Sequence, residues 1–397
     1  MSNKNIVDSY NPLIIRIPDM ENIFDYNEKP EYSTNIDYPR FSFGFQHFIH
    51  ATKKKMQILD QFKNKKKVYH VLDAFNRHID EYENTISSEL SKYIKIDESE
   101  INPDFLKYWE ILHMFDLIND DSNFVSAHLS DGYLAQVVLN FRDKYFKNTN
   151  KDKYYVLAAY KNELTSDISD KTKRIKINEK TNDKMNLVTA NLGYTEYGSY
   201  IQEQTSFKLL IAQINKAINI QKKDGNFVLK FYENFTNMSL KIIAILKSLY
   251  EQVILIKPFT SKLSKSERYC VCLKFKFDSK NLTSITKKME NIVESNDKND
   301  KNIVDIFPDY KFDKNFINTM IYANLFLENR QFKALNDIII FINSQNFMGE
   351  LYQEKRLQQI EATKNWIANF LDKNVKQTLQ NKVKEIIINH SKKVKTY

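Results

Sequence analysis

One lysine of this 397-residue chain stands inside an apolar run of the kind that forms buried strands. Lys230 lies between Leu229 and Phe231, and a charged side chain is seldom buried without a function or a partner. Such a lysine can act as a base only if its pKa is lowered, which desolvation and nearby positive charge achieve. Lys107 and Glu267 give no such signal alone, because a helix lysine is usually solvated and a glutamate at a strand start usually joins a surface ion pair.

The cysteines and histidines do not indicate a metal site. Cys270 and Cys272 are the only cysteines. They can supply neither the four ligands of a structural zinc site nor a disulfide framework. His128 has no ligand spacing around it, and we expect it in a loop. A reducing, intracellular environment suits such a chain.

Short apolar segments alternate with helical patterns through the middle of the chain. In 204–220, for example, apolar residues recur every three or four positions, which is typical of a helix. We expect strands at 123–127, 154–159, 186–190, 227–232, 253–257 and 269–277, and helices at 102–115, 134–145, 204–220 and 238–250. This alternation predicts an α/β fold with a Rossmann-like sheet and helices on both faces. The last strand alternates apolar and polar residues, so we expect it to be half-buried and antiparallel.

The flanking regions have different patterns. Residues 1–40 show no periodicity and predict an extended, irregular arm, whereas 41–93 predict basic helices. A polar stretch at 295–302 has the composition of a linker, and three or four packed helices are expected after it. The expected divisions are therefore 1–100, 101–277 and 278–397.

The middle division contains several unusual segments in a fixed order. Its most specific part is Lys-Pro-Phe-Thr-Ser at 257–261, followed by Ser-Glu-Arg-Tyr at 266–269. Together with 187–194, 208–213 and 225–230, these segments resemble the FtsJ-like RNA 2′-O-methyltransferases, and most of all the cap methyltransferases of eukaryotes and large DNA viruses. The resemblance is collinear over 101–277 and does not extend to the flanking regions.

The resemblance implies a catalytic site. The family uses a Lys-Asp-Lys-Glu tetrad, and Lys107, Lys230 and Glu267 fall on three of its positions, with Asn191 in place of the aspartate. Lys230 would be the base that accepts the proton of a ribose hydroxyl, and Glu267 would orient the ammonium groups. We therefore expect these residues, far apart in the chain, to meet at the strand ends. With one carboxylate for two lysines, the site is expected to be cationic, which disfavours a positively charged donor.

The resemblance also implies S-adenosylmethionine as the methyl donor. The counterpart of the family's glycine-rich donor loop comprises His128, Ser130, Asp131, Gly132 and Tyr133. Asp131 stands where the first glycine would be, and its carboxylate would face that of the donor. Glu163 is the candidate for holding the donor ribose.

A net charge of +9 and a pI near 9.0 favour a polyanionic partner. Lysine runs at 53–55 and 65–67, with Lys257, Lys262 and Lys265, could follow an RNA backbone or could simply solvate the surface. The longest apolar run, 338–342, is too short to cross a bilayer. The resemblance implies capped mRNA and subunits of a capping or transcription complex as partners, in the cytoplasm, a viral factory or a virion.

Three functions are compatible with these patterns. The first is an mRNA cap 2′-O-methyltransferase that uses S-adenosylmethionine. The second is a catalytically inactive methyltransferase-fold subunit that binds RNA or supports a partner. The third is a nucleic-acid-binding protein unrelated to capping, and the ordered motifs at 188–276 weigh against it.

Overall fold

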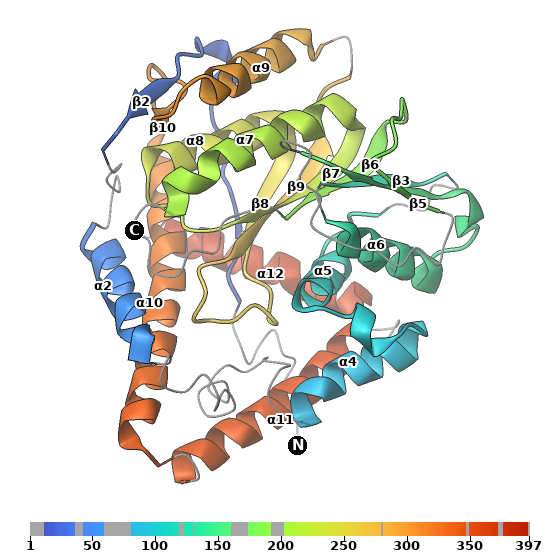
Figure 1. The fold of residues 1–397 in the computed structure, drawn as a ribbon, viewed down its shortest axis with the longest axis vertical. Coiled ribbons are helices and arrows are strands. Elements are labelled where there is room, and N and C mark those ends of the chain that lie inside the picture. Colours follow the sequence, from blue (N-terminus) through green and yellow to red (C-terminus); the bar gives the residue numbers. More distant parts are fainter. Residues whose placement is uncertain are drawn as a thin grey trace.

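The computed structural model describes residues 12–35, 43–58, 81–118, 123–129, 131–159, 174–191, 202–278, 281–346, 349–371 and 376–395. Their largest sheet has the strand order β1-β8-β9-β7-β6-β3-β4-β5 (Figure 1). The strands are β1 (Ile14–Arg16), β3 (Val125–Leu129), β4 (Lys153–Leu157), β5 (Ile175–Ile177), β6 (Met185–Ala190), β7 (Gln221–Phe231), β8 (Tyr250–Ile256) and β9 (Arg268–Phe275). Neighbours from β5 to β7 pair in parallel, whereas β9 runs antiparallel between β7 and β8.

The strand order reverses direction between β3 and β6. From β3 the chain proceeds outward to β4 and β5, and from β6 it proceeds the other way to β7. In open α/β sheets such a reversal leaves a crevice at the carboxyl ends of the two strands, where ligands bind. The residues that follow β3 and β6 therefore lie where a ligand site is expected.

Helices cover both faces of the sheet (Figure 1). The apolar core of one face is completed by α7 (Gln202–Ile220), α8 (Asn237–Leu249), α9 (Thr283–Asp297) and α10 (Lys314–Ser344). The core of the other face is completed by α5 (Pro103–Met114), α6 (Gly132–Tyr145), α11 (Glu350–Phe370) and α12 (Lys376–Val394). The predicted Rossmann-like α/β fold is confirmed.

The start of α5 follows from local sequence. The Asn102 side chain accepts a hydrogen bond from the Phe105 amide at 2.8 Å, and Pro103 occupies the first turn, where its missing N–H costs nothing. Every residue from Phe105 to Met114 is buried. Lys107 is thus enclosed, contrary to what a lysine on an isolated helix suggests.

The N-terminal arm is more regular than expected. Its strand β1 pairs with β8 and forms the edge of the main sheet, while β2 (Glu31–Ser33) pairs with β10 (Asn302–Asp305). The expected linker at 295–302 begins in the last turn of α9 and ends at β10. Short 3-10 helices cover Ile23–Asp25 (η1), Glu98–Glu100 (η3) and Thr149–Lys151 (η4).

In the flanking regions the described residues form the helices α2 (Phe43–Lys55), α4 (Glu81–Ile94), α10, α11 and α12, as predicted. The part of the expected basic helices at 59–80 lies outside the described residues. None of the described helices is both long and apolar enough to cross a membrane.

The prediction that the last strand is half-buried is wrong. Because β9 lies between β7 and β8, it is covered on both faces, and its first five residues are buried. Cys270 and Cys272 face one core, and Tyr269 and Val271 face the other. Both cysteines are free thiols.

Candidate active site

Three side chains from distant parts of the chain meet at the end of β7. Lys107 Nζ lies 2.8 Å from Glu267 Oε1, and Lys230 Nζ lies 3.7 Å from Glu267 Oε2. The side chains of Lys107, Lys230 and Glu267 are 7%, 9% and 6% exposed, so the ion pairs are largely removed from water. The structure therefore brings these three residues together, as expected.

A fourth charged residue, Asp104, joins this group although sequence reasoning missed it. Its carboxylate lies 2.9 Å from Lys107 Nζ and 3.6 Å from Lys230 Nζ. The signal was present in the sequence, because Asp104 precedes Lys107 by three residues and shares its face of α5. The expectation of a cationic site is therefore wrong, since two carboxylates balance the two ammonium groups.

These carboxylates also determine the protonation of the lysines. Burial alone would lower the pKa of Lys230, but Asp104, Glu267 and Asp131 outweigh it and raise that pKa. The pKa of Lys107 is raised in the same way by Glu267 and Asp104 against the effect of burial. Burial would raise the pKa of Glu267, yet Lys107 and Lys230 lower it to about 2. The expected lowering of the Lys230 pKa is thus wrong for the chain by itself.

Asn191 and Asp131 occupy the crevice between the ends of β6 and β3. Asn191 Nδ2 donates hydrogen bonds to Asp104 Oδ2 and to Asp131 Oδ2, both at 2.9 Å. Asp131 Oδ1 accepts from the Tyr133 amide at 3.0 Å and so caps α6. Burial and the nearby Asp104 raise the pKa of Asp131, although the bond from Asn191 opposes this. Asn191 Oδ1 is buried and has no hydrogen-bond partner within the described ranges.

The other residues expected near the donor are placed differently. His128 belongs to β3, not to a loop as predicted, and its ring nitrogens contact Thr189 Oγ1 at 2.8 Å and Ser126 Oγ at 2.9 Å. Burial lowers its pKa to about 3, so the ring is neutral. Gly132 is the buried first residue of α6, and Tyr133 is half-buried. Ser130 and Glu163 lie outside the described residues.

The central part of the chain matches a known protein family. Residues 104–275 match the model of the FtsJ-like methyltransferase family. This segment, called the FtsJ-like domain below, is similar to that family. It contains all four charged residues of the buried cluster, and the resemblance predicted from the sequence is confirmed.

The relatives of the FtsJ-like domain include cap methyltransferases. Cap-specific mRNA (nucleoside-2′-O-)-methyltransferase 1 of Mus musculus is 31% identical over 185 residues, which are 45% of this chain and 22% of that protein. The uncharacterized protein R383 of Acanthamoeba polyphaga mimivirus is 24% identical over 305 residues, which are 74% of this chain and 73% of that protein. An inactive cap-specific mRNA (nucleoside-2′-O-)-methyltransferase 1B of Caenorhabditis briggsae is 27% identical over 173 residues, covering 42% of this chain and 20% of that protein. The chain thus spans about a fifth of the two cap methyltransferases.

A buried glutamate holds the Lys-Pro-Phe-Thr-Ser loop of the FtsJ-like domain in place. Glu110, one turn after Lys107 on α5, accepts hydrogen bonds from the amides of Phe259 at 2.7 Å and Thr260 at 3.0 Å. It also accepts from Thr260 Oγ1 at 2.5 Å and from Trp366 Nε1 of α11 at 3.0 Å. Burial raises the pKa of Glu110 to about 7. Sequence reasoning missed this residue, which ties the loop to a C-terminal helix.

The same loop positions Glu267. Ser261 Oγ donates to Glu267 Oε1 at 2.9 Å, and Lys257 Nζ donates to the carbonyls of Lys265 at 2.7 Å and Glu267 at 2.9 Å. Burial lowers the pKa of Lys257 to about 7. The suggestion that Lys257 follows an RNA backbone on the surface is wrong, because its ammonium group is occupied inside the domain.

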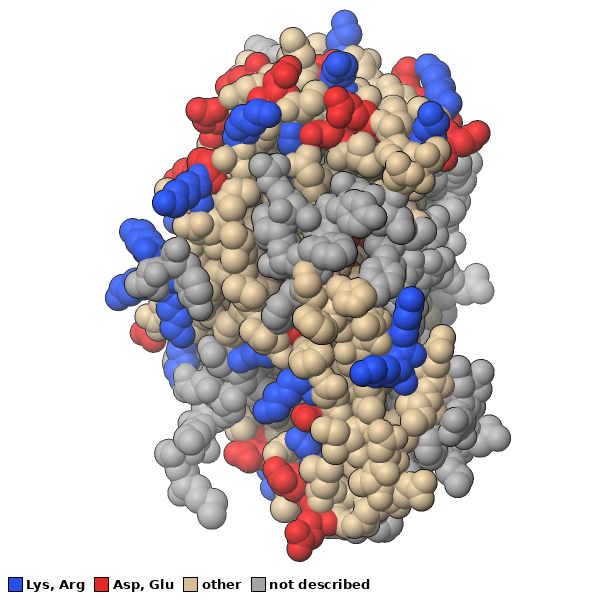
Figure 2. All heavy atoms as spheres, turned by 90° about the vertical axis from the view of Figure 1, so that its left-hand side faces the viewer, with Lys and Arg blue, Asp and Glu red and all other residues tan. Residues whose placement is uncertain are grey.

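Of the lysine run at 53–55, Lys53 is buried, whereas Lys54 and Lys55 are exposed. Lys53 is buried and pairs with Glu233, whose other oxygen lies 2.9 Å from His50 Nε2. The run at 65–67 lies outside the described residues. On the face that carries α2 and α10, Lys and Arg are interspersed with acidic and uncharged residues (Figure 2). No group of three or more His, Cys, Asp or Glu in the described part of the chain could hold a metal ion.

Proposed function

We propose that this chain is an RNA 2′-O-methyltransferase that uses S-adenosylmethionine and acts in the cap region of mRNA. The observation that carries the proposal is the buried meeting of Lys107, Lys230 and Glu267 in an FtsJ-like domain. The names of several relatives, cap-specific mRNA (nucleoside-2′-O-)-methyltransferases, support the substrate class.

Each charged residue has a part in the proposed reaction. Lys230 Nζ accepts the proton of the ribose 2′-hydroxyl as the oxygen becomes a nucleophile. Lys107 and Glu267 hold Lys230 and the hydroxyl in position, and such positioning lowers the activation barrier of the transfer. Asp104 supplies the second carboxylate, in place of the aspartate that Asn191 replaces.

The residues at the crevice fit the amino-acid end of S-adenosylmethionine, which supplies the methyl group when bound. The unpartnered Oδ1 of Asn191 and the carboxylate of Asp131 are both hydrogen-bond acceptors, and they suit an ammonium group. Gly132, at the buried start of α6, is the third residue that would hold the donor. A carboxylate of the donor is favoured away from Asp131, because like charges repel.

One observation favours a second function, that of a catalytically inactive subunit that binds RNA or supports a capping complex. Asp104, Glu267 and Asp131 keep Lys230 charged, and a charged lysine cannot accept a proton. The two functions differ in whether a bound donor, which is positively charged at sulfur, lowers the pKa of Lys230 enough for catalysis.

Calorimetry with S-adenosylmethionine, followed by transfer of a radioactive methyl group to capped RNA, separates the two functions. The methyltransferase function predicts donor binding, and transfer that Lys230→Met abolishes without loss of donor binding. Lys274→Met, at a 60% exposed lysine on the same sheet, is the control and should transfer normally. Absence of donor binding at millimolar concentration would leave only the inactive subunit.

A further inference from the structure

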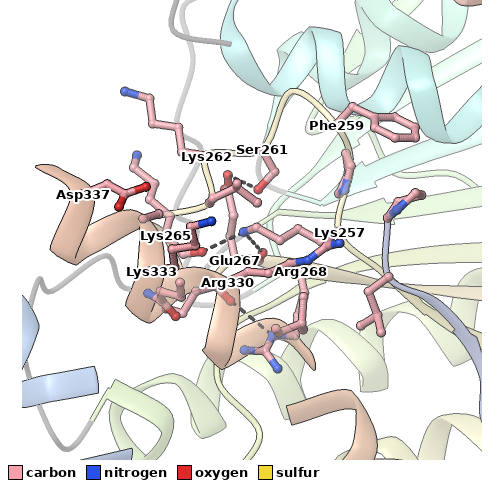
Figure 3. A pocket seen from close by; sticks show the side chains of 18 of the residues that line it. Lys257, Phe259, Ser261, Lys262, Lys265, Glu267, Arg268, Arg330, Lys333 and Asp337 are labelled. Carbon is pink, nitrogen blue, oxygen red and sulfur yellow. Dashed lines mark hydrogen bonds between the residues drawn. The ribbon is translucent and has the colours of Figure 1, made fainter. Parts of the chain in front are cut away.

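A cavity of about 350 Å³ adjoins the charged cluster (Figure 3). One wall is the loop between β8 and β9, from Lys257 to Arg268, and the other consists of α10 and α11. Both helices lie beyond residue 275, where the match to the FtsJ-like family ends. The cavity is therefore a feature of this chain's own architecture and not of the family domain alone.

The lining of the cavity is strongly basic. Seven lining residues are Lys or Arg and two are acidic, the basic ones being Lys257, Lys262, Lys265, Arg268, Arg330, Lys333 and Lys355, and the acidic ones Glu267 and Asp337. Arg268 is neutralised by Glu328, which lies 2.7 Å away. Lys257 is also occupied, because its ammonium group donates to the carbonyls of Lys265 and Glu267. Without Arg268 and Lys257 the lining still has more basic than acidic residues, so the cavity favours an anion.

The lining also has an apolar part, beside the polar residues Ser261, Ser266, Gln331 and Gln358. Pro12 and Leu13 from the N-terminal arm, Phe259 from the loop and Leu327 from α10 contribute to it. A purely inorganic anion would gain nothing from these side chains. A nucleotide, which joins an apolar base to charged phosphates, suits both parts, and the volume is within the usual range for a small-ligand site.

Glu267 links the cavity to the proposed reaction centre. Its side chain contacts Lys107 and Ser261, and the residue also lines the cavity. Figure 3 shows Lys262, Lys265 and Lys333 on the side of the cavity nearest Asp337, with Glu267 beside Lys257. An RNA strand that presents a ribose to Lys230 thus has a basic recess immediately beside it.

We propose that this cavity binds a nucleotide through its phosphate groups, with α10 and α11 supplying part of the charge. The inference rests on the proposed function, because RNA at the Lys230 site is the nearest source of such a nucleotide. A free nucleoside triphosphate has the same chemistry and is distinguished from RNA by the experiment below.

The test measures binding of a fluorescein-labelled short capped RNA by anisotropy at several salt concentrations, with guanosine triphosphate as competitor. Lys333→Ala combined with Lys355→Ala removes two basic residues of the helical wall, one exposed and one half-buried. Ala334→Phe, at a half-buried lining position, fills the cavity while keeping every charge. The matched control combines Lys223→Ala and Lys287→Ala, at two exposed lysines that do not line this cavity.

We expect the paired lysine variant to weaken RNA binding by about tenfold and to reduce the salt slope by about 0.7 for each phosphate that the variant no longer neutralises. Ala334→Phe should weaken binding without changing the slope as much, and the control pair should have little effect. Displacement of the RNA by guanosine triphosphate would identify a site open to free nucleotides, whereas failure to displace it would assign the site to RNA.

Equal losses in the lysine pair and the control pair, or unchanged binding in the cavity variants, would overturn the inference. Methyl transfer and donor binding are measured separately. Loss of RNA binding in the cavity variants of a chain that never transfers a methyl group would uphold the cavity and reject the proposed reaction. Normal methyl transfer together with unchanged RNA binding in the cavity variants would uphold the proposed reaction and reject the cavity as a nucleotide site.

Discussion

Restoring the family's aspartate at position 191 should damage this protein unless Asp104 is changed as well. Asn191 Nδ2 lies 2.9 Å from a carboxylate oxygen of Asp104 and 2.9 Å from one of Asp131. Asn191→Asp removes both hydrogen bonds, each worth roughly 1.5 to 3 kcal/mol because the acceptor is charged. It also brings three carboxylates together, and at an effective dielectric constant of about 20 each ionised pair at this distance repels by up to about 6 kcal/mol.

Protonation relieves part of that repulsion, so we expect Asn191→Asp to lower the free energy of unfolding by about 3 kcal/mol at neutral pH. The new carboxyl group has a raised pKa in the folded state. The loss should therefore be present above the ordinary aspartate range and should fade as the pH falls through the raised value. Asp104→Asn in the same chain returns the number of carboxylates to two and should recover at least about 2 kcal/mol.

Denaturant titrations, followed by tryptophan fluorescence, are made on the unaltered chain, the two single variants and the double variant. Together they give the coupling free energy between positions 104 and 191. The two tryptophans, Trp109 and Trp366, are both fully buried and report on the core that contains α5. Asp116→Asn, at an exposed carboxylate just beyond α5, is the control and should add to Asn191→Asp without coupling. Simple additivity of Asp104→Asn and Asn191→Asp, to within about 0.5 kcal/mol, would refute the role given to Asp104.

The same group of residues supports three further predictions. Asp104→Asn removes a negative charge 3.6 Å from Lys230 Nζ, so the midpoint of the rise of methyl transfer with pH should move down by at least about one unit, and an unmoved midpoint would exclude Lys230 as the base. Glu110→Gln places an amide N–H group against the N–H groups that Glu110 now accepts from, so it should lower the free energy of unfolding by about 1 to 3 kcal/mol. Denaturant titration measures this loss, and Glu98→Gln, at an exposed site, should show none. Lys257 has a pKa of about 7 in the folded chain against 10.5 in the unfolded one, so between these pH values the unfolded chain binds more protons. The free energy of unfolding should therefore rise as the pH increases from about 7 to 10.5. Lys257→Met should flatten that rise in thermal melting, Lys298→Met at a 78% exposed lysine should not, and an equal rise in both variants would contradict the assignment.

Much of the fold could be predicted from local sequence patterns. The Asn102 cap, the period of α7 and the alternation of β9 each depend on a few adjacent residues, and they predicted the helices and strands of the central sheet. The three-residue strand β1 was missed because so short a segment has no period, and its structure comes from pairing with β8. The burial of β9 could not be predicted from its own alternation, since it depends on which strands lie beside it.

The candidate site was predictable only in part, and for a similar reason. Lys107, Lys230 and Glu267 fell on family motifs. Asp104 lies at the start of α5, and its importance comes from contacts with Asn191, which follows β6, and with Lys230 of β7. Lys257 resembled a surface lysine in the sequence, but the carbonyls of Lys265 and Glu267 hold its ammonium group inside the domain. The protonation of Lys230 depends on three carboxylates far from it in sequence, so the sign of its pKa shift could not be obtained from its neighbours in the chain.

The most direct test of the proposed reaction is mass spectrometry of nucleosides released from capped RNA after incubation with the chain and S-adenosylmethionine. We predict a ribose that carries a 2′-O-methyl group in the cap region with the unaltered chain, and none with Lys230→Met. Unmethylated RNA from the unaltered chain, or equal methylation by both chains, would contradict the proposal that Lys107, Lys230 and Glu267 form a working catalytic site.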